Sequence, residues 1–251
     1  MASQTQRDGV ASVADHYDRL LAEHYTWMSG DFAEKVSEQR ALLSSLGLPR
    51  SGSRRALDLG SGPGFQSIAL AEIGYEVTAL DTSRKLLAEL TDRKGSLPIA
   101  AVEADIAAGL PMIEPGVEVA LCMGDTLTHL SSKDDVLRLF TEVHRLLAPG
   151  GRFVLGFRDL TAELRGTDRF IPVRSDSHRI MTCFLEYEPE TVIVHDLIHV
   201  RDGEDWVLRK SSYRKLRLAP DWVAARLTAC GFAVQRAEPI GRMSVIVADR
   251  P

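Results

Sequence analysis

The chain has 251 residues, of which 45% are hydrophobic and 26% charged, and its formal net charge is −5 at pH 7. This composition is typical of a globular α/β domain, with or without an insertion. A mildly acidic chain is a poor match for a phosphate backbone, so we expect no nucleic-acid partner. The short basic pairs Arg209-Lys210 and Arg214-Lys215 are expected to lie on a solvated surface.

The cysteine pattern and the hydropathy narrow the class of protein further. Cys122, Cys183 and Cys230 are widely spaced and form no CxxC pair, so neither a metal site nor a disulfide framework is expected. The N-terminus lacks the apolar core of a signal peptide, and no segment approaches the ~20 apolar residues of a membrane span. We therefore expect a cytoplasmic protein, a monomer or a homodimer, with no membrane partner.

The first predicted elements are two amphipathic helices. Tyr17, Leu20 and Tyr25 have helical spacing, Trp27–Gly30 interrupts the pattern, and a second helix is predicted from Phe32 to Leu46. Residues 1–53 are interpreted as an N-terminal helical lid.

Short apolar strands then alternate with helices. Strands are predicted at Ala56–Leu59, Glu76–Leu80, Ile99–Glu103, Val117–Met123 and Arg152–Phe157, and helices at Ser67–Ile73, Ser83–Leu90 and Asp134–Leu147. Pro149-Gly150-Gly151 is expected to end the last of these helices. Because strands and helices alternate at this spacing, residues 54–157 are predicted to form the core of a parallel, doubly wound sheet.

The pattern changes after Phe157. The polar segment Arg158–Asp176 is expected to be a loop or a short helix. Three β-rich runs follow, so residues 158–218 are predicted to be an antiparallel insertion that binds the substrate: Arg179–Tyr187, Thr191–Arg201 and Trp206–Leu218.

Residues 219–251 are expected to complete the core. A helix is predicted at Ala219–Cys230, followed by strands at Ala233–Ala237 and Met243–Ala248. The predicted fold class is α/β: a doubly wound, mostly parallel, seven-stranded Rossmann-like sheet, with N-terminal lid helices and an antiparallel β insertion after the fifth strand.

A glycine-rich turn follows the first predicted strand and carries most of the functional argument. It reads Asp58-Leu59-Gly60-Ser61-Gly62-Pro63-Gly64. Glycines allow the backbone to turn tightly and to approach a ligand closely. Asp58 would repel a phosphate but would attract an ammonium group, so the turn suits a ligand with an amino-acid end rather than a diphosphate.

A second acidic residue, Asp81, ends the second predicted strand, about 20 residues beyond the glycine turn. A carboxylate at this position is placed to accept hydrogen bonds from both hydroxyls of a ribose. The segment Asp81-Thr82-Ser83 is also a plausible helix N-cap, and both roles are compatible.

Together these motifs resemble those of class I S-adenosylmethionine (SAM)-dependent methyltransferases of the small-molecule kind. The resemblance extends over Arg55–Phe157 and includes Asp105-Ile106, Cys122-Met123-Gly124-Asp125 and Leu146–Gly151. It implies SAM as the cofactor. It also implies cofactor contacts from these residues: Asp58, Gly60, Ser61, Gly62 and Gly64 at the methionine end, Asp81 and Thr82 at the ribose, Asp105 and Ile106 at the adenine, and Met123 and Gly124 beside the acceptor.

The N-terminal aromatic residues Tyr17, Tyr25 and Trp27 are more loosely similar to the lid helices of glycine and amino-sugar N-methyltransferases. Core packing of an added helix would explain them equally well. By the same similarity, Tyr25 and Trp27 are candidates for cofactor contact.

The methyl acceptor is expected to be a small soluble molecule, most simply an amine or a hydroxyl compound. An amine accepts a methyl group only when it is neutral, so a nearby side chain is expected to manage its proton. Asp125 and His129 follow the fourth strand, and His16 precedes Tyr17. We take Tyr17, Asp125 and His129 as the candidate catalytic residues.

Three other functions stay open at the level of sequence. An NAD-dependent oxidoreductase would share the glycine turn, although Asp58 and Pro63 argue against it. A SAM-binding protein without catalysis would share all the cofactor motifs. An enzyme that consumes SAM differently, for example by cyclising its amino-acid arm, would share them too.

Overall fold

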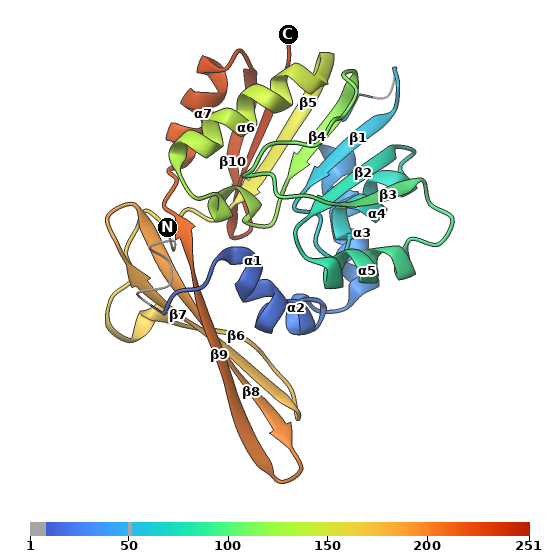
Figure 1. The fold of residues 1–251 in the computed structure, drawn as a ribbon. Coiled ribbons are helices and arrows are strands. Elements are labelled where there is room, and N and C mark those ends of the chain that lie inside the picture. The colour runs from blue at the N-terminus through green and yellow to red at the C-terminus, as the bar shows by residue number, and fades with distance from the viewer. Residues whose placement is uncertain (1–8, 50–51) are drawn as a thin grey trace.

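Seven strands form the central sheet of the computed structural model, which describes residues 9–49 and 52–251. The strand order is β10-β11-β5-β4-β1-β2-β3 (Figure 1). The parallel strands β1 to β5 span Arg55–Leu59, Glu76–Asp81, Ile99–Glu103, Val117–Cys122 and Leu147–Phe157. The strands β10 (Ala233–Ile240) and β11 (Met243–Asp249) follow, and β11 runs antiparallel to both β10 and β5. The predicted mostly parallel seven-stranded sheet is confirmed.

Helices cover both faces of this sheet. One hydrophobic cluster joins the sheet to α6 and α7, and another joins it to α3, α4 and α5 (Figure 1). These helices span Phe32–Ser45 (α3), Phe65–Glu72 (α4), Arg84–Arg93 (α5), Lys133–Leu146 (α6) and Pro220–Ala229 (α7). Strand β5 follows α6 directly, so Pro149–Gly151 belongs to the strand and not, as expected, to a turn that ends the helix.

The N-terminal segment forms a nearly continuous helical run. It comprises α1 (Val13–His16), a π-helical segment (Tyr17–Leu21) and α2 (Ala22–Ser29). The predicted interruption at Trp27–Gly30 is wrong in extent: the helix continues to Ser29, and Gly30 alone, at φ +107°, ends it. Residues 1–8 and 50–51 of the predicted lid lie outside the described residues. None of the described helices is both long and apolar enough to cross a bilayer.

The insertion is a four-stranded antiparallel sheet that projects from the core (Figure 1). Its strands are β6 (Phe170–Ser175), β7 (Arg179–Tyr187), β8 (Thr191–Asp202) and β9 (Asp205–Leu216). The segment Arg158–Asp176 was expected to be a loop or a short helix, but its second half contains strand β6. This strand is an edge strand whose residues are almost all exposed, so no hydrophobic alternation marks it.

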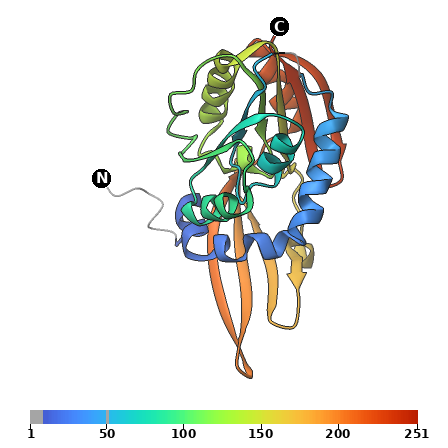
Figure 2. The same cartoon turned by 90° about the vertical axis from the view of Figure 1, so that its right-hand side faces the viewer.

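The N-terminal helices lie between this insertion and the core (Figure 2). Leu20 and Leu21 pack with Met181 and Ile198 on the inner face of the insertion. The contact places the helical run Val13–Ser29 over the carboxyl ends of the parallel strands, where open α/β sheets bind their ligands.

Candidate active site

The glycine turn between β1 and α4 is closely packed. Gly60 and Gly64 have φ values of +70° and +96°. A Cβ atom on Gly60 would lie 2.2 Å from Thr126 Oγ1, and one on Gly64 would lie 2.2 Å from Leu90 Cδ1. Only glycine fits these two positions, because both the backbone angle and the space exclude a side chain.

Two carboxylates hold the loops at the ends of β2 and β3. Asp81 accepts hydrogen bonds from the backbone N–H of Gly62 and of Ser83, both at 2.8 Å. Burial raises the Asp81 pKa against the opposing effect of these N–H groups. Asp105 accepts from the backbone N–H of Ala107 at 2.8 Å. The N-cap of α5 is Ser83, whose hydroxyl accepts from the Leu86 N–H, so Asp81 lies outside the helix as the residue that ends β2.

Asp58 lies beneath the glycine turn and only 1% of it is exposed. Its carboxylate accepts a hydrogen bond from Ser67 Oγ at 2.6 Å. Burial raises the Asp58 pKa to about 7. In this structure the carboxylate therefore ties β1 to α4 and does not face open space.

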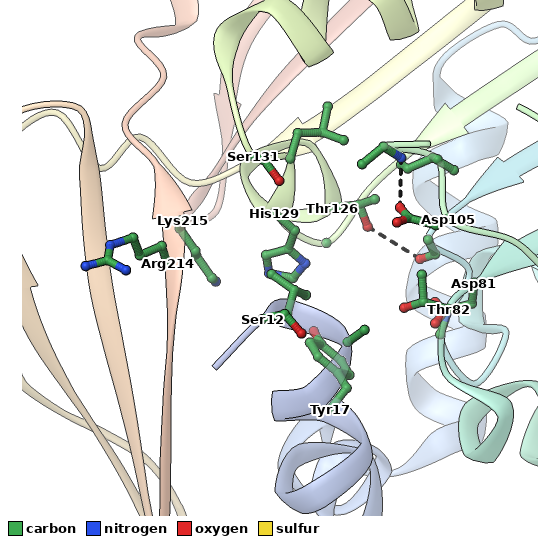
Figure 3. A pocket seen from close by; sticks show the side chains of 18 of the residues that line it. Ser12, Tyr17, Asp81, Thr82, Asp105, Thr126, His129, Ser131, Arg214 and Lys215 are labelled. Carbon is green, nitrogen blue, oxygen red and sulfur yellow. Dashed lines mark hydrogen bonds between the residues drawn. The ribbon is translucent and has the colours of Figure 1, made fainter. Parts of the chain in front are cut away.

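A cavity of about 610 Å³ lies over the ends of the parallel strands (Figure 3). Its size suits a ligand of drug-like dimensions. One half is lined by the loops after β1, β2 and β3, and the other by residues 10–14, the turn after β4 and the end of β9. The predicted site residues in its wall are Tyr17, Tyr25, Gly60, Gly62, Asp81, Thr82, Asp105, Ile106, Gly124 and His129.

Six of the expected site residues lie outside that wall: Trp27, Asp58, Ser61, Gly64, Met123 and Asp125. The Trp27 indole N–H donates to Asp176 at 2.5 Å, so its ring packs toward the insertion. Ser61, Gly64 and Met123 belong to loops whose other residues form the wall.

Asp125 is buried in a charge network and does not open onto the cavity. Its carboxylate accepts from the Arg158 backbone N–H at 2.8 Å, from the Arg158 guanidinium, and from Lys215 Nζ at 2.8 Å. Burial alone would raise the Asp125 pKa, but Lys215 and Arg158 outweigh it and hold the pKa well below its usual range. This geometry argues against the expected role of Asp125 as a proton acceptor.

Asp125 also has an unusual backbone, with φ at +77° in a non-glycine residue. This left-handed position starts the 3-10 turn Thr126–His129. Asp125 and its two cations therefore hold the turn that carries His129, and such strained positions persist only where surrounding contacts enforce them.

The His129 and Tyr17 rings both line the cavity and pack edge to face, with centroids 5.8 Å apart (Figure 3). The His129 Nε2 atom is buried and has no hydrogen-bond partner among the described residues. Burial, followed by the charge of Lys215, lowers the His129 pKa to about 3, so the imidazole is neutral at physiological pH. Burial also raises the Tyr17 pKa well above its usual value, so the phenol keeps its proton.

His16, the other histidine considered from sequence, serves a structural contact. Its Nε2 atom lies 2.8 Å from Asp196 Oδ2, and both residues are almost fully buried. Its ring stacks on Tyr213. The pair joins α1 to β8 behind the cavity wall.

Comparisons with known proteins identify the kind of domain that this chain contains. Residues 56–151 match the methyltransferase domain family. YqeM of Bacillus subtilis, which is classed as a methyltransferase, is 29% identical over 193 residues that cover 75% of this chain and 76% of YqeM. This chain therefore carries a methyltransferase domain within the fold of SAM-dependent methyltransferases.

Other relatives of this methyltransferase carry more specific names. The glycine/sarcosine N-methyltransferase of Aphanothece halophytica is 27% identical over 157 residues, which cover 61% of this chain. The match spans about half, 55%, of that relative's length.

Solved structures share the fold. The CcbJ methyltransferase from Streptomyces caelestis superposes with a TM-score of 0.76 at 21% identity, over 92% of this chain and 96% of that chain. The sugar N-methyltransferase KedS8 from Streptoalloteichus gives a TM-score of 0.72 at 16% identity, over 93% of each chain.

Within the insertion, which was expected to bind the substrate, Lys215 is a cavity residue that the sequence did not predict. Arg214-Lys215 was expected on a solvated surface, yet Lys215 is only 8% exposed and lines the cavity. Arg214 also lines the cavity, and its guanidinium, directed away from His129 in Figure 3, pairs with Glu188 at 2.9 Å. The one available signal was strand alternation, which places adjacent residues on opposite faces of β9.

Proposed function

We propose that this methyltransferase transfers the SAM methyl group to a neutral amine of a small soluble molecule. The observation that carries the proposal is the neutral His129, whose Nε2 has no partner among the described residues and whose side chain lines the same cavity as Gly60 and Asp81. N-methyltransferases among the relatives support the choice of an amine. A hydroxyl acceptor would need a base, and the nearby Asp125 carboxylate is already occupied by Lys215 and Arg158.

The residues around the glycine turn fit SAM. Gly60, Gly62 and Gly124 bring bare backbone to the cavity wall, and the buried hydroxyl of Ser61 has no partner among the described residues. We infer that these loops hold the methionine end, that Asp81 binds the ribose, and that Asp105 with Ile106 borders the adenine. SAM supplies an activated methyl group on a sulfonium sulfur. The protein's task is then to align the acceptor and to exclude water.

At the acceptor, we infer that His129 Nε2 accepts a hydrogen bond from an N–H of the amine and so aims its lone pair. Tyr17 packs edge to face against His129 and retains its phenolic proton, so its hydroxyl can donate a hydrogen bond to a polar group of the acceptor other than the reacting nitrogen. Asp125 acts through the turn that it begins and is a positioning residue.

The N-terminal helices are inferred to act as a lid over the reacting groups. Residues 10–14 and Tyr17 line the cavity, and the backbone N–H of Ala11 donates to Ser212 O at 2.8 Å. We propose the division into lid (1–53), SAM-binding core (54–157), substrate-binding insertion (158–218) and C-terminal completion of the sheet (219–251) on this basis.

Replacing Asp81 by alanine is expected to weaken SAM binding about tenfold or more. Two ribose hydroxyls that donate to one carboxylate form charge-assisted hydrogen bonds, each worth roughly 1.5–3 kcal/mol. Isothermal titration calorimetry with S-adenosylhomocysteine measures the loss. Asp92→Ala, an exposed position on α5, is the matched control. An unchanged Kd for Asp81→Ala, in a protein that melts normally, would place the ribose elsewhere.

The proposed reaction is tested by incubating the protein with methyl-labelled SAM and a panel of amines, amino acids and phenols. Mass spectrometry should detect a methylated amine together with S-adenosylhomocysteine. Methylthioadenosine as the spent cofactor would mean attack on the amino-acid arm and would refute methyl transfer. Methylation of phenols alone would refute the choice of an amine.

A further inference from the structure

The groups that face His129 are unusually rich in positive charge. Lys215 Nζ reaches it from β9 and Arg158 from the end of β5, and both pair with the single carboxylate of Asp125. From α1, His16 is committed to Asp196. The rings of Tyr17 and Tyr213 complete the surroundings, with centroids 5.8 Å and 5.6 Å from the His129 ring.

Among the described residues, no carboxylate lines the half of the cavity around His129, which we propose holds the acceptor. The two that line the cavity, Asp81 and Asp105, lie at the opposite side, on the loops after β2 and β3 (Figure 3). An ammonium group placed beside His129 would be a third cation around one carboxylate. A proton transferred to the imidazole would meet the same charges, in a site that water does not screen well.

Figure 3 shows the Lys215 side chain directed toward His129. The Lys215 residue is almost completely buried, lines the cavity and donates from its ammonium group to Asp125. Two cations share a single buried anion here, so burying a neutral side chain at this position would cost less free energy than burying lysine. The position is nevertheless occupied by lysine.

We propose that Lys215 makes the site select the free-base form of its acceptor, by excluding the ammonium form and by keeping His129 uncharged. This inference rests on the proposed amine methylation. In it, His129 orients the amine but takes no proton: the first stays in the solvent when the free amine enters. As the new C–N bond replaces the C–S bond, the sulfonium charge passes to the product, which leaves as an ammonium ion and loses its proton to the solvent. Lys215 is therefore a specificity-determining residue for the protonation state of the substrate.

The first test measures His129 directly and needs no substrate. In histidine-labelled protein, the His129 ring signal is assigned with a His129→Asn variant and followed by NMR from pH 8 to pH 4. We expect the wild-type signal to stay at its neutral position. Lys215→Met should shift the midpoint upward by about one pH unit, because a neighbouring like charge has been removed. Lys210→Met, an exposed lysine on the same strand, should match the wild type.

Either of two NMR results would overturn the proposal. One is a wild-type His129 titration midpoint near the ordinary histidine pKa. This result needs only the wild type, so it can refute the proposal even if Lys215→Met does not fold. The other is a folded Lys215→Met protein whose His129 signal is indistinguishable from that of the wild type.

The second test uses two amine acceptors of different basicity. In the wild type, kcat/KM should rise about tenfold per pH unit until it levels off at the pKa of each free amine. The variant is distinguished by kcat at saturating total amine: it should stay constant in the wild type and fall at pH values below the amine pKa in Lys215→Met, where the bound ammonium form blocks the site without reacting. If the fall of kcat/KM at acidic pH had the same midpoint for both amines, the titrating group would belong to the enzyme and the proposal would be refuted. If no amine is methylated, the proposed function fails, while the NMR result stands by itself.

Discussion

Replacing His129 by alanine is expected to lower kcat for the acceptor about a hundredfold while the affinity for S-adenosylhomocysteine stays close to that of the wild type. His129 lines the half of the cavity that we propose holds the acceptor, and its imidazole, whose Nε2 has no partner among the described residues, would hold the amine in line. Loss of alignment by about 1 Å costs on the order of a hundredfold in rate. Single-turnover kinetics measure the chemical step, and calorimetry measures cofactor binding separately.

Two further variants sharpen this prediction. His129→Gln retains a side-chain oxygen that accepts a hydrogen bond, so its loss should be smaller than that of alanine. His178→Ala removes an exposed histidine of the β6–β7 turn, outside the cavity wall, and should leave turnover unchanged. If His129→Ala weakened cofactor binding and turnover equally, the residue would belong to the cofactor site instead.

The second large effect is expected on stability, from Asp125→Ala. This variant leaves Lys215 buried without its carboxylate, and breaking a buried ion pair from one side typically costs about 3–5 kcal/mol. The Arg158 side chain is 55% exposed, so solvent screens its share and most of the cost comes from Lys215. Urea unfolding of the cofactor-free protein measures the change.

A double variant distinguishes the ion pair from the backbone effect. Asp125→Ala combined with Lys215→Met removes both partners and should recover a large part of the lost stability. Asp125→Asn should be milder than alanine, because asparagine tolerates the positive φ at this position. If the double variant were as unstable as the two single losses added together, the ion pair would not be the cause.

The same pair predicts the pH dependence of stability. The folded state holds the Asp125 pKa below its unfolded value, so the stabilising contribution is present above the unfolded pKa and disappears as the pH falls through the folded one. The difference in unfolding free energy between wild type and Asp125→Ala should therefore be constant at neutral pH and should shrink only in strong acid.

Local chemistry made the cofactor half of the molecule predictable. The Asp58–Gly64 turn and Asp81 each stand at the end of a short apolar strand, so their residue types and spacing can be recognised from neighbouring positions in the chain. The parallel order of the core follows from the same alternation of strands and helices. Edge strand β6 escaped detection because its exposed residues bury no face.

The sequence by itself therefore determined the fold class, the cofactor and the loops at the ends of β1 to β3, because these depend on residues close together in the chain. Tertiary structure alone decided the acceptor half. Asp125 and Lys215 are 90 residues apart, and only the docking of β9 against the turn after β4 makes one the partner of the other. Because of that docking, we propose Asp125 as a positioning residue rather than a base. Lys215, which was expected at the surface, lines the cavity. Burial and pairing, which control charge in a protein interior, are properties of the folded chain.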